Sequence, residues 1–125
     1  MSARKAAVPA PGGPAPGYVP ERGDVVWLDF DPQAGHEQAK RRPAVVLSPA
    51  AYNGRTSLAL CCPVTSRVKG YPFEVALPAG GKAQGAVLAD QVRSLDWRAR
   101  RAAYLDALPA PALAQVLARA RALLA

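Results

Sequence analysis

The sequence contains few of the side chains on which many enzymes depend. Its 125 residues include one histidine, one methionine and two cysteines, and aromatic side chains make up 6%. The single histidine, His36, excludes a ribonuclease mechanism that needs a pair of histidines, and it has no cysteine or histidine neighbour at metal-ligand spacing. The sequence therefore predicts no metal site and no cofactor.

The two cysteines, Cys61 and Cys62, are adjacent within the apolar run LALCCPV. Successive side chains of a strand point to opposite faces, so this pair makes a poor disulfide and a poor metal site. We expect two buried free thiols, which fits a reducing compartment. No apolar run approaches the roughly 20 residues of a membrane span, and the N-terminus lacks the apolar core of a signal peptide. These absences predict a cytoplasmic protein without a membrane partner.

Acidic residues are also scarce. Sixteen lysines and arginines stand against nine aspartates and glutamates, which gives a net charge of +7. Residues 1–17 are mostly alanine, proline and glycine, so we expect a disordered tail there and one domain at residues 18–125. The tail holds only Arg4 and Lys5, which leaves +5 on the domain. That excess favours a polyanionic partner, the alternative being a solvated basic surface with no specific partner.

Short apolar runs predict a mostly β domain. Strands are expected at residues 24–32, 43–48, 57–65 and 103–107, and the unbroken apolar run of 57–65 indicates burial on both faces. Residues 73–78 and 85–92 should form a hairpin joined by the loop AGGKAQG. One helical turn is expected at residues 48–54. Several short strands with long loops favour a small β-barrel over alternating βαβ units.

The last 17 residues carry the one strong helix pattern. Pro109 and Pro111 suit a first helical turn, where their missing N–H groups cost little. An apolar stripe that would dock on the sheet comprises Leu113, Val116, Leu117, Ala120 and Leu124. We expect Arg119 and Arg121 to face away from the sheet.

Two segments could carry chemistry. In GHEQAKRRPAVVLS, at residues 35–48, three consecutive cations lead into a strand, where Arg42 would be held firmly enough to bind a phosphate. The alternative is a solvated charge run. In TSRVKGYPFEV, Thr65 and two cations leave a buried strand, although threonine at a strand end is also common for β-propensity or as a turn hydroxyl. The loop GGKAQG has Ala83 after its lysine, so it is interpreted as a hairpin loop and not as a phosphate loop.

Six segments together resemble a known family. In chain order they are YVPERGDVVWLDFDP, GHEQAKRRPAVVLSP, YNG, CCPVTS, KGYPFEV and GAVLADQVRSLDWRAR, and they span most of the chain. They strongly resemble the MazF/PemK endoribonuclease toxins of bacterial toxin–antitoxin systems. The resemblance implies a mostly β fold with a C-terminal helix, the SH3-like β-barrel of CcdB/MazF-type plasmid maintenance toxins, assembled as a homodimer.

The resemblance also implies an activity. MazF-like proteins cut single-stranded RNA, mainly messenger RNA, at short sequences without a metal ion. They leave 2′,3′-cyclic phosphate and 5′-hydroxyl ends and so inhibit translation. Their antitoxin, MazE, lays an acidic segment over the RNA groove at the dimer interface. We therefore expect an mRNA interferase whose partners are single-stranded RNA, a MazE-like acidic antitoxin and a second copy of the chain.

Carried over residue by residue, the resemblance places the catalytic arginine at Arg42 and the catalytic threonine at Thr65. The acid of the family's GSEQ loop matches Glu37, with His36 in place of serine. Contacts to RNA are expected at Gln38, Arg41, Lys69 and Gln91. The cluster Arg98, Arg100 and Arg101 could contact further phosphates or be ordinary surface charge.

Cleavage through a cyclic phosphate needs a deprotonated 2′-hydroxyl, a neutralised phosphorane and a protonated leaving oxygen. Arg42 is a poor base with a pKa above about 12, so we assign it charge stabilisation first and proton donation as a hypothesis. Thr65 would hydrogen-bond the phosphate or the attacking oxygen. Glu37 is either the general base or a group that positions Arg42 and accepts from an RNA base. Because neighbouring cations should lower its pKa, we prefer positioning.

Two rival functions remain. A CcdB-like toxin binds DNA gyrase without cutting RNA and depends on an aromatic residue near its C-terminus, whereas this chain ends in ARALLA. The other rival is a nucleic-acid-binding barrel that has lost its activity, which the presence of both Arg42 and Thr65 argues against.

Overall fold

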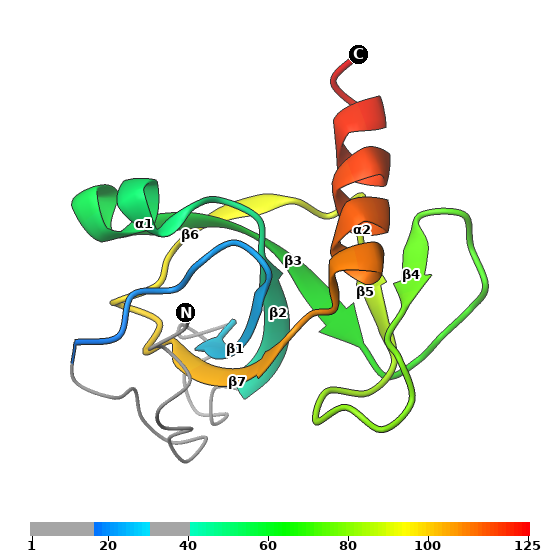
Figure 1. The fold of residues 1–125 in the computed structure, drawn as a ribbon, viewed down its shortest axis with the longest axis horizontal. Coiled ribbons are helices and arrows are strands. Elements are labelled where there is room, and N and C mark those ends of the chain that lie inside the picture. The colour runs from blue at the N-terminus through cyan, green and yellow to red at the C-terminus, as the bar shows by residue number, and fades with distance from the viewer. Residues whose placement is uncertain (1–16, 31–40) are drawn as a thin grey trace.

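The computed structural model describes residues 17–30 and 41–125, which form seven strands and two helices (Figure 1). The strands are β1 (Asp24–Asp29), β2 (Arg41–Val46), β3 (Leu58–Thr65), β4 (Glu74–Ala76), β5 (Ala86–Leu88), β6 (Arg93–Asp96) and β7 (Ala103–Ala107), and the helices are α1 (Ala50–Thr56) and α2 (Ala110–Ala122). Most of the expected tail and the segment that contains His36, Glu37 and Gln38 lie outside the described residues. The tail and domain boundary therefore stay predictions.

The strands form one antiparallel path in the order β4, β5, β3, β2, β1, β7, and β6 pairs with the first half of β3. The sheet curls strongly, and the short β4–β5 hairpin lies beside α2 (Figure 1). Within the described residues, the two end strands of this path do not pair with each other. The expected mostly β fold with a C-terminal helix is confirmed, as a barrel-like sheet that stays open.

Both faces of the central strands are buried, in two separate clusters. Val25, Val45 and Cys62 belong to the cluster beneath α2, which also contains Val116 of that helix. Their strand neighbours, such as Val26, Val46 and Cys61, belong to the cluster on the opposite face, with Leu95 and Trp97. This alternation follows from the period of two in a strand. It confirms that the two cysteines point to opposite faces as free thiols.

Several sequence predictions need correction at their edges. β1 ends at Asp29, short of residue 32, and β5 is only three residues long. Burial of β3 on both faces fails at Leu60, which is 41% exposed. Strand β6 was not predicted at all, because its residues RSLD carry one buried apolar side chain, Leu95. Its backbone is ordered by pairing with β3, which no local pattern reveals.

Helix α2 buries only the lower part of its expected stripe. Val116 is fully buried, and Leu113, Leu117 and Ala120 pack against the same cluster. Leu124 follows the helix and is 85% exposed, so its predicted place in the stripe is wrong. The end of α2 projects beyond the sheet (Figure 1).

The prediction that Arg119 faces away from the sheet is also wrong. Its Nε donates to the carbonyl oxygen of Pro72 at 3.0 Å, in the segment just before β4.

Neither helix in the described part of the chain is long and apolar enough to cross a membrane.

Candidate active site

Arg42 and Thr65, predicted from distant segments, come together at one end of the sheet. Strands β2 and β3 pair antiparallel with Ala44 opposite Pro63, and Arg42 and Thr65 each lie two residues beyond that pair, toward the same end of the sheet. Both residues line an open hollow of about 530 Å³. The two residues to which the resemblance assigns catalysis thus line the same hollow.

The hollow is polar and its described lining contains no acid. Its polar side chains are Arg42, Thr65, Ser66, Arg67 and Gln84, and an apolar wall comes from Pro43 and Val64. Two guanidinium groups without a lining carboxylate give the described part of this hollow a positive potential. Such a site attracts anions, and phosphates match the geometry of guanidinium groups.

The hydroxyl of Thr65 is held by the backbone that follows it. Thr65 is the last residue of β3, and its Oγ1 accepts a hydrogen bond from the backbone N–H of Arg67 at 3.0 Å. This local turn, in which a hydroxyl accepts from the N–H two residues on, is a common way of fixing a threonine side chain. Because Oγ1 is already an acceptor, the hydroxyl hydrogen remains available to a bound anion.

Arg41 and Arg42 have different surroundings because side chains alternate along β2. Arg42 is exposed, whereas Arg41 forms an ion pair with Asp29, Nη1 to Oδ1, at 2.8 Å. Arg41 also donates from Nη2 to the carbonyl oxygen of Arg101 at 2.8 Å. The guanidinium of Arg41 is therefore engaged within the fold, and its expected contact with RNA stays a prediction.

Asp29 is the centre of an ion cluster that ties the start of β2 to the segment before β7. Its Oδ2 accepts from Nε of Arg101 at 2.8 Å, and its side chain is only 10% exposed. Hydrogen bonds from Arg101, and then from Arg41, lower the pKa of Asp29 although burial opposes them. Arg100 adds hydrogen bonds from Nη1 to the carbonyl oxygens of Asp29 and Phe30. The cluster fixes the backbone next to Arg42.

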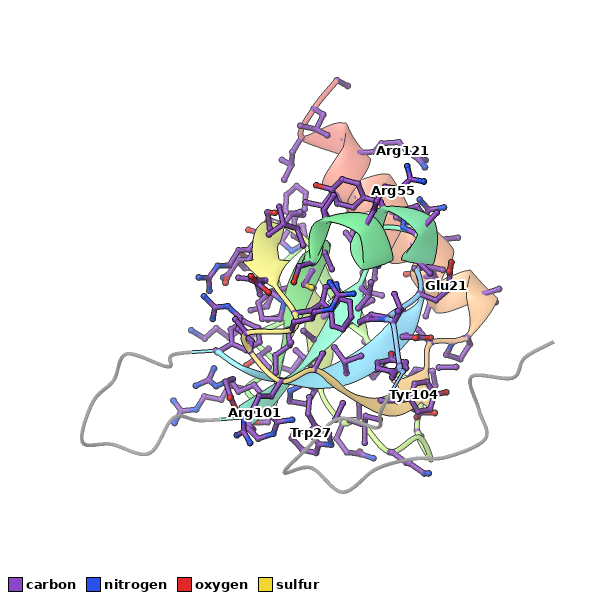
Figure 2. All side chains as sticks on the ribbon, turned by 90° about the vertical axis from the view of Figure 1, so that its left-hand side faces the viewer. Glu21, Trp27, Arg55, Arg101, Tyr104 and Arg121 are labelled. Carbon is purple, nitrogen blue, oxygen red and sulfur yellow. The ribbon has the colours of Figure 1, made fainter. Side chains whose placement is uncertain are left out.

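The arginines at residues 98–101, left open between phosphate contacts and surface charge, have internal partners. Arg98 lies 4.3 Å from the ring centroid of Trp97 and donates to the carbonyl oxygen of Gly54. Arg100 and Arg101 belong to the Asp29 cluster. Figure 2 shows Arg101 at the far end of the molecule from Arg121. These side chains stabilise the fold.

Gly85 brings the end of the β4–β5 loop against Thr65. Its φ is +108°, which residues other than glycine rarely adopt. A Cβ added to residue 85 would also lie 2.0 Å from the carbonyl oxygen of Thr65. The approach is possible only because glycine has no side chain. GGKAQG is thus a hairpin loop, as predicted, and its last residue packs directly on the backbone of the candidate threonine.

Gly85→Ala should therefore displace Thr65. We expect a loss of about 2 kcal/mol in the free energy of unfolding from the strained φ and the contact, and a fall of about 10²-fold in RNA cleavage from the moved hydroxyl. Denaturant unfolding and cleavage kinetics measure the two effects. Gly80→Ala is the matched control, because Gly80 has a φ of +90° but nothing within 4 Å of its added Cβ. Equal activity losses in both variants would contradict the contact with Thr65.

Lys69 and Gln91 are not among the described residues that line the hollow. Lys69 is exposed, and its backbone N–H donates to the carboxylate of Glu74 at 3.1 Å. Gln91 is exposed in the turn after β5, where its N–H donates to the carbonyl oxygen of Leu88. Glu37 and Gln38 lie outside the described residues. Their expected roles stay predictions.

The buried thiols have no place in this site. Burial raises the pKa of Cys61 and of Cys62 to about 12, so neither is a thiolate at neutral pH. In the described ranges, no three side chains of histidine, cysteine, aspartate or glutamate gather where they could hold a metal ion. The chemistry that the described hollow can perform is hydrogen bonding and charge neutralisation of an anion.

Three features of the site were missed by sequence reasoning: the role of Asp29, the need for glycine at residue 85, and the place of Arg67. The alternation in DVVWLDFDP indicated that an acid follows buried residues, which was the one available signal for Asp29. The other two features depend on contacts between β3 and the β4–β5 loop, which only the folded chain reveals.

Comparison with known proteins gives consistent matches. The family model described as PemK-like, MazF-like toxin of type II toxin–antitoxin system matches residues 21–124. Endoribonuclease toxin MazF of Escherichia coli strain K12 is 59% identical over 85 residues, which cover 68% of this chain and 76% of that protein. Endoribonuclease PemK of Escherichia coli is 39% identical over 105 residues, covering 79% of this chain and 77% of that protein.

A solved structure extends the match to three dimensions. The crystal structure of MazE-MazF (Form-II) from Deinococcus radiodurans contains a chain that superposes with a TM-score of 0.82 at 64% identity. The match covers 86% of this chain and 96% of that chain. The likeness therefore includes the sheet and the helix described above.

Proposed function

This chain belongs to the PemK-like, MazF-like toxin family of type II toxin–antitoxin systems, and we propose that it is an endoribonuclease toxin that cleaves single-stranded RNA. The observation that carries the proposal is the hollow that Arg42 and Thr65 line together. Its described lining is positively charged and open to solvent, as a site for a phosphodiester must be. The main substrate that we propose is messenger RNA, and its cleavage inhibits translation.

The reaction that fits these side chains is transesterification within the RNA strand. The 2′-hydroxyl gives its proton to a solvent water as its oxygen forms a bond to the adjacent phosphorus. The P–O5′ bond breaks, and its electron pair remains on the 5′-oxygen, which takes a proton from solvent. The products are a 2′,3′-cyclic phosphate and a 5′-hydroxyl. Arg42 neutralises the charge that develops on the phosphorane oxygens, and Thr65 donates its hydroxyl hydrogen to one of them. The proposed reaction uses no metal ion or other cofactor.

Glu37 completes the proposed site from the segment outside the described residues. We assign it the positioning of Arg42 and the acceptance of a hydrogen bond from an RNA base. The three cations that follow it in the sequence, Lys40, Arg41 and Arg42, are expected to favour its charged, weakly basic form, which suits positioning better than general-base catalysis. Gln38, Lys69 and Gln91 are proposed contacts to RNA, on the strength of the family resemblance. Arg41 is proposed to act mainly through its ion pair with Asp29, which fixes the strand that carries Arg42.

The proposed partners follow from the family. The similar Deinococcus radiodurans structure is a MazE-MazF complex, and we propose that a MazE-like acidic antitoxin binds and inhibits this chain. An acidic segment complements a hollow whose described lining has two arginines and no carboxylate. We also propose a homodimer and a cytoplasmic location. The rival reading, a CcdB-like toxin that binds DNA gyrase, is not favoured, because the matching relatives are named endoribonucleases.

The proposed function is tested by incubating the purified protein with a long single-stranded RNA in EDTA and mapping the new 5′ ends. We expect cuts at discrete positions with 5′-hydroxyl ends, since neither side chain assigned to the chemistry needs a metal ion. The same map gives the cleavage sequence. Intact RNA at high protein excess would refute endoribonuclease activity on that RNA, and a gyrase-binding assay would follow.

Thr65→Val is the matched control in that experiment. Valine keeps the β-branched shape at the end of β3 but removes the hydroxyl, and with it the acceptor of the Arg67 N–H. Because Arg67 is exposed, water can replace that hydrogen bond, and the fold should survive. We expect cleavage at the same positions, about 10- to 100-fold more slowly, because one hydrogen bond to the phosphorane is lost. Unchanged cleavage by this variant would exclude the Thr65 hydroxyl from the reaction or reveal a contaminating nuclease, which a mock preparation distinguishes.

A further inference from the structure

The arginines of this chain divide into those that serve the fold and those that do not. Most guanidinium groups have a partner within the protein: Arg22, Arg41, Arg93, Arg98, Arg100, Arg101 and Arg119 contact a carbonyl oxygen, a carboxylate or an aromatic ring. In the described ranges 17–30 and 41–125, the guanidinium groups without such a partner belong to Arg42, Arg55, Arg67 and Arg121. This second set is where a ligand for guanidinium is expected.

Two members of that second set lie in the same place. Arg42 and Arg67 both line the hollow that contains Thr65, whereas Arg55 and Arg121 do not. Arg42 comes from the start of β2 and Arg67 from the segment just after β3, so they approach the hollow from neighbouring strands. A guanidinium that has no protein partner among the described residues can bind an anion without first breaking an ion pair within the fold.

The backbone of Arg67 is also hydrogen-bonded to the threonine side chain that is proposed to take part in the reaction. Its backbone N–H donates to Oγ1 of Thr65 at 3.0 Å, so the position of its main chain is fixed relative to that hydroxyl. Lys69, two residues further on, differs, because its main chain is turned toward Glu74 and it does not line the hollow. Of the two cations that follow Thr65, Arg67 is the one that faces the site.

We propose that Arg67 is a second phosphate-binding arginine of the active site, which grips an RNA phosphate adjacent to the scissile one. This proposal rests on the proposed function for its substrate class. Arg42 contacts the phosphate that reacts, and Arg67 binds the neighbouring phosphate. The RNA strand is therefore held at two phosphates beside Thr65. The contact made by Arg67 is the same before and during the reaction, and it therefore contributes to RNA affinity and not to turnover.

The test compares Arg67→Ala with Arg121→Ala, which removes the same charge from the end of α2, at the end of the molecule away from Arg101 (Figure 2). The binding probe is a 2′-O-methylated single-stranded RNA, which lacks the attacking hydroxyl at every position. It carries the mapped cleavage sequence, or a random sequence if no cleavage is found. Affinity is measured over a range of salt concentrations, and kcat and KM are measured with unmodified RNA.

For Arg67→Ala we expect about tenfold weaker binding, from one lost hydrogen-bonded phosphate contact, and a salt dependence of log K reduced by about 0.7. KM should rise while kcat stays within about twofold. Arg67→Lys should recover the salt slope but only part of the affinity, because lysine keeps the charge without the fork of donors. Arg121→Ala should match the unmutated protein.

Binding and salt slope equal to those of Arg121→Ala would overturn the proposal, and so would a fall in kcat with unchanged affinity. Thermal unfolding checks each variant, and no loss of stability is expected, since the Arg67 guanidinium has no partner among the described residues. The methylated probe separates the two ideas: a chain that binds it through Arg67 but cuts no RNA would keep this proposal and refute the proposed function.

Discussion

Replacing Arg42 with alanine is expected to lower kcat/KM for RNA cleavage by about 10²- to 10³-fold, the typical cost of removing one preorganised donor from a developing oxyanion. The loss should fall mainly on kcat, because charge on the phosphorane oxygens grows in the transition state. The fold should be unaffected, since Arg42 is exposed and its guanidinium has no partner among the described residues. Cleavage kinetics and denaturant unfolding of the same preparation measure both quantities.

Arg42→Lys shows whether charge alone is sufficient. Lysine keeps the positive charge but offers a single point charge in place of a planar fork, so we expect it to recover about a tenth or less of the lost activity. A lysine variant as active as the unmutated protein would show that the bidentate geometry is unnecessary. An alanine variant with full activity would remove Arg42 from the proposed chemistry altogether.

Replacing Asp29 with alanine is expected to lower the free energy of unfolding by about 3 kcal/mol, the lower end of the range for breaking a buried ion pair. The side chains of Asp29 and Arg41 are only 10% and 13% exposed, and both Arg41 and Arg101 donate to this carboxylate at 2.8 Å. Its removal leaves the two guanidinium groups without the acid that they share. Urea unfolding at neutral pH measures the loss.

The contribution of Asp29 should also depend on pH. Hydrogen bonds from Arg101, and then from Arg41, lower the pKa of Asp29 below its ordinary value of 3.8. A carboxyl group whose pKa is lower in the folded state stabilises the fold fully above that ordinary value, and the contribution is lost as the pH falls through the folded pKa. The difference in stability between the unmutated protein and Asp29→Asn should therefore be largest near neutral pH and shrink below about pH 3.8.

Asp29→Asn is the control for shape, because asparagine has nearly the same size and no charge. We expect Asp29→Asn to be less destabilised than Asp29→Ala. It should also lose activity, because Arg41, which pairs with Asp29, and Arg42 are adjacent at the start of β2. A stability difference that stays constant from pH 7 to pH 2 would contradict the assigned pKa and its cause.

The sequence predicted the secondary-structure elements of this fold better than the contacts between them. Alternation and turn residues predicted the position of every strand except β6, whose four residues bury only Leu95 and take their conformation from pairing with β3. The stripe of α2 was predicted as far as Ala120, but the helix extends past the sheet, so Leu124 is exposed. Helical periodicity indicates which residues share a face, not how far that face is covered.

In the candidate site, too, residues were predicted better than their contacts. Family resemblance supplied Arg42 and Thr65, and the pairing of β2 with β3 brings the ends that carry them to one hollow. It gave no sign that Arg41 forms an ion pair with Asp29 while Arg67 lines the hollow. Arginines look equivalent in a sequence. Which of them serves the fold and which can bind a ligand depends on the face of the strand to which each side chain points and on whether a carboxylate lies beside it.

The described lining of the hollow comes from three separated parts of the chain, at residues 42–43, 64–67 and 84. A polypeptide still emerging from the ribosome therefore lacks this lining until residue 84 has been made and the β4–β5 hairpin has packed against β3. Because the sheet is held by long-range pairings, a partly synthesised chain has the sequence of the site without its geometry. The nascent chain is thus without the described lining of the hollow while the first two thirds of its residues are translated.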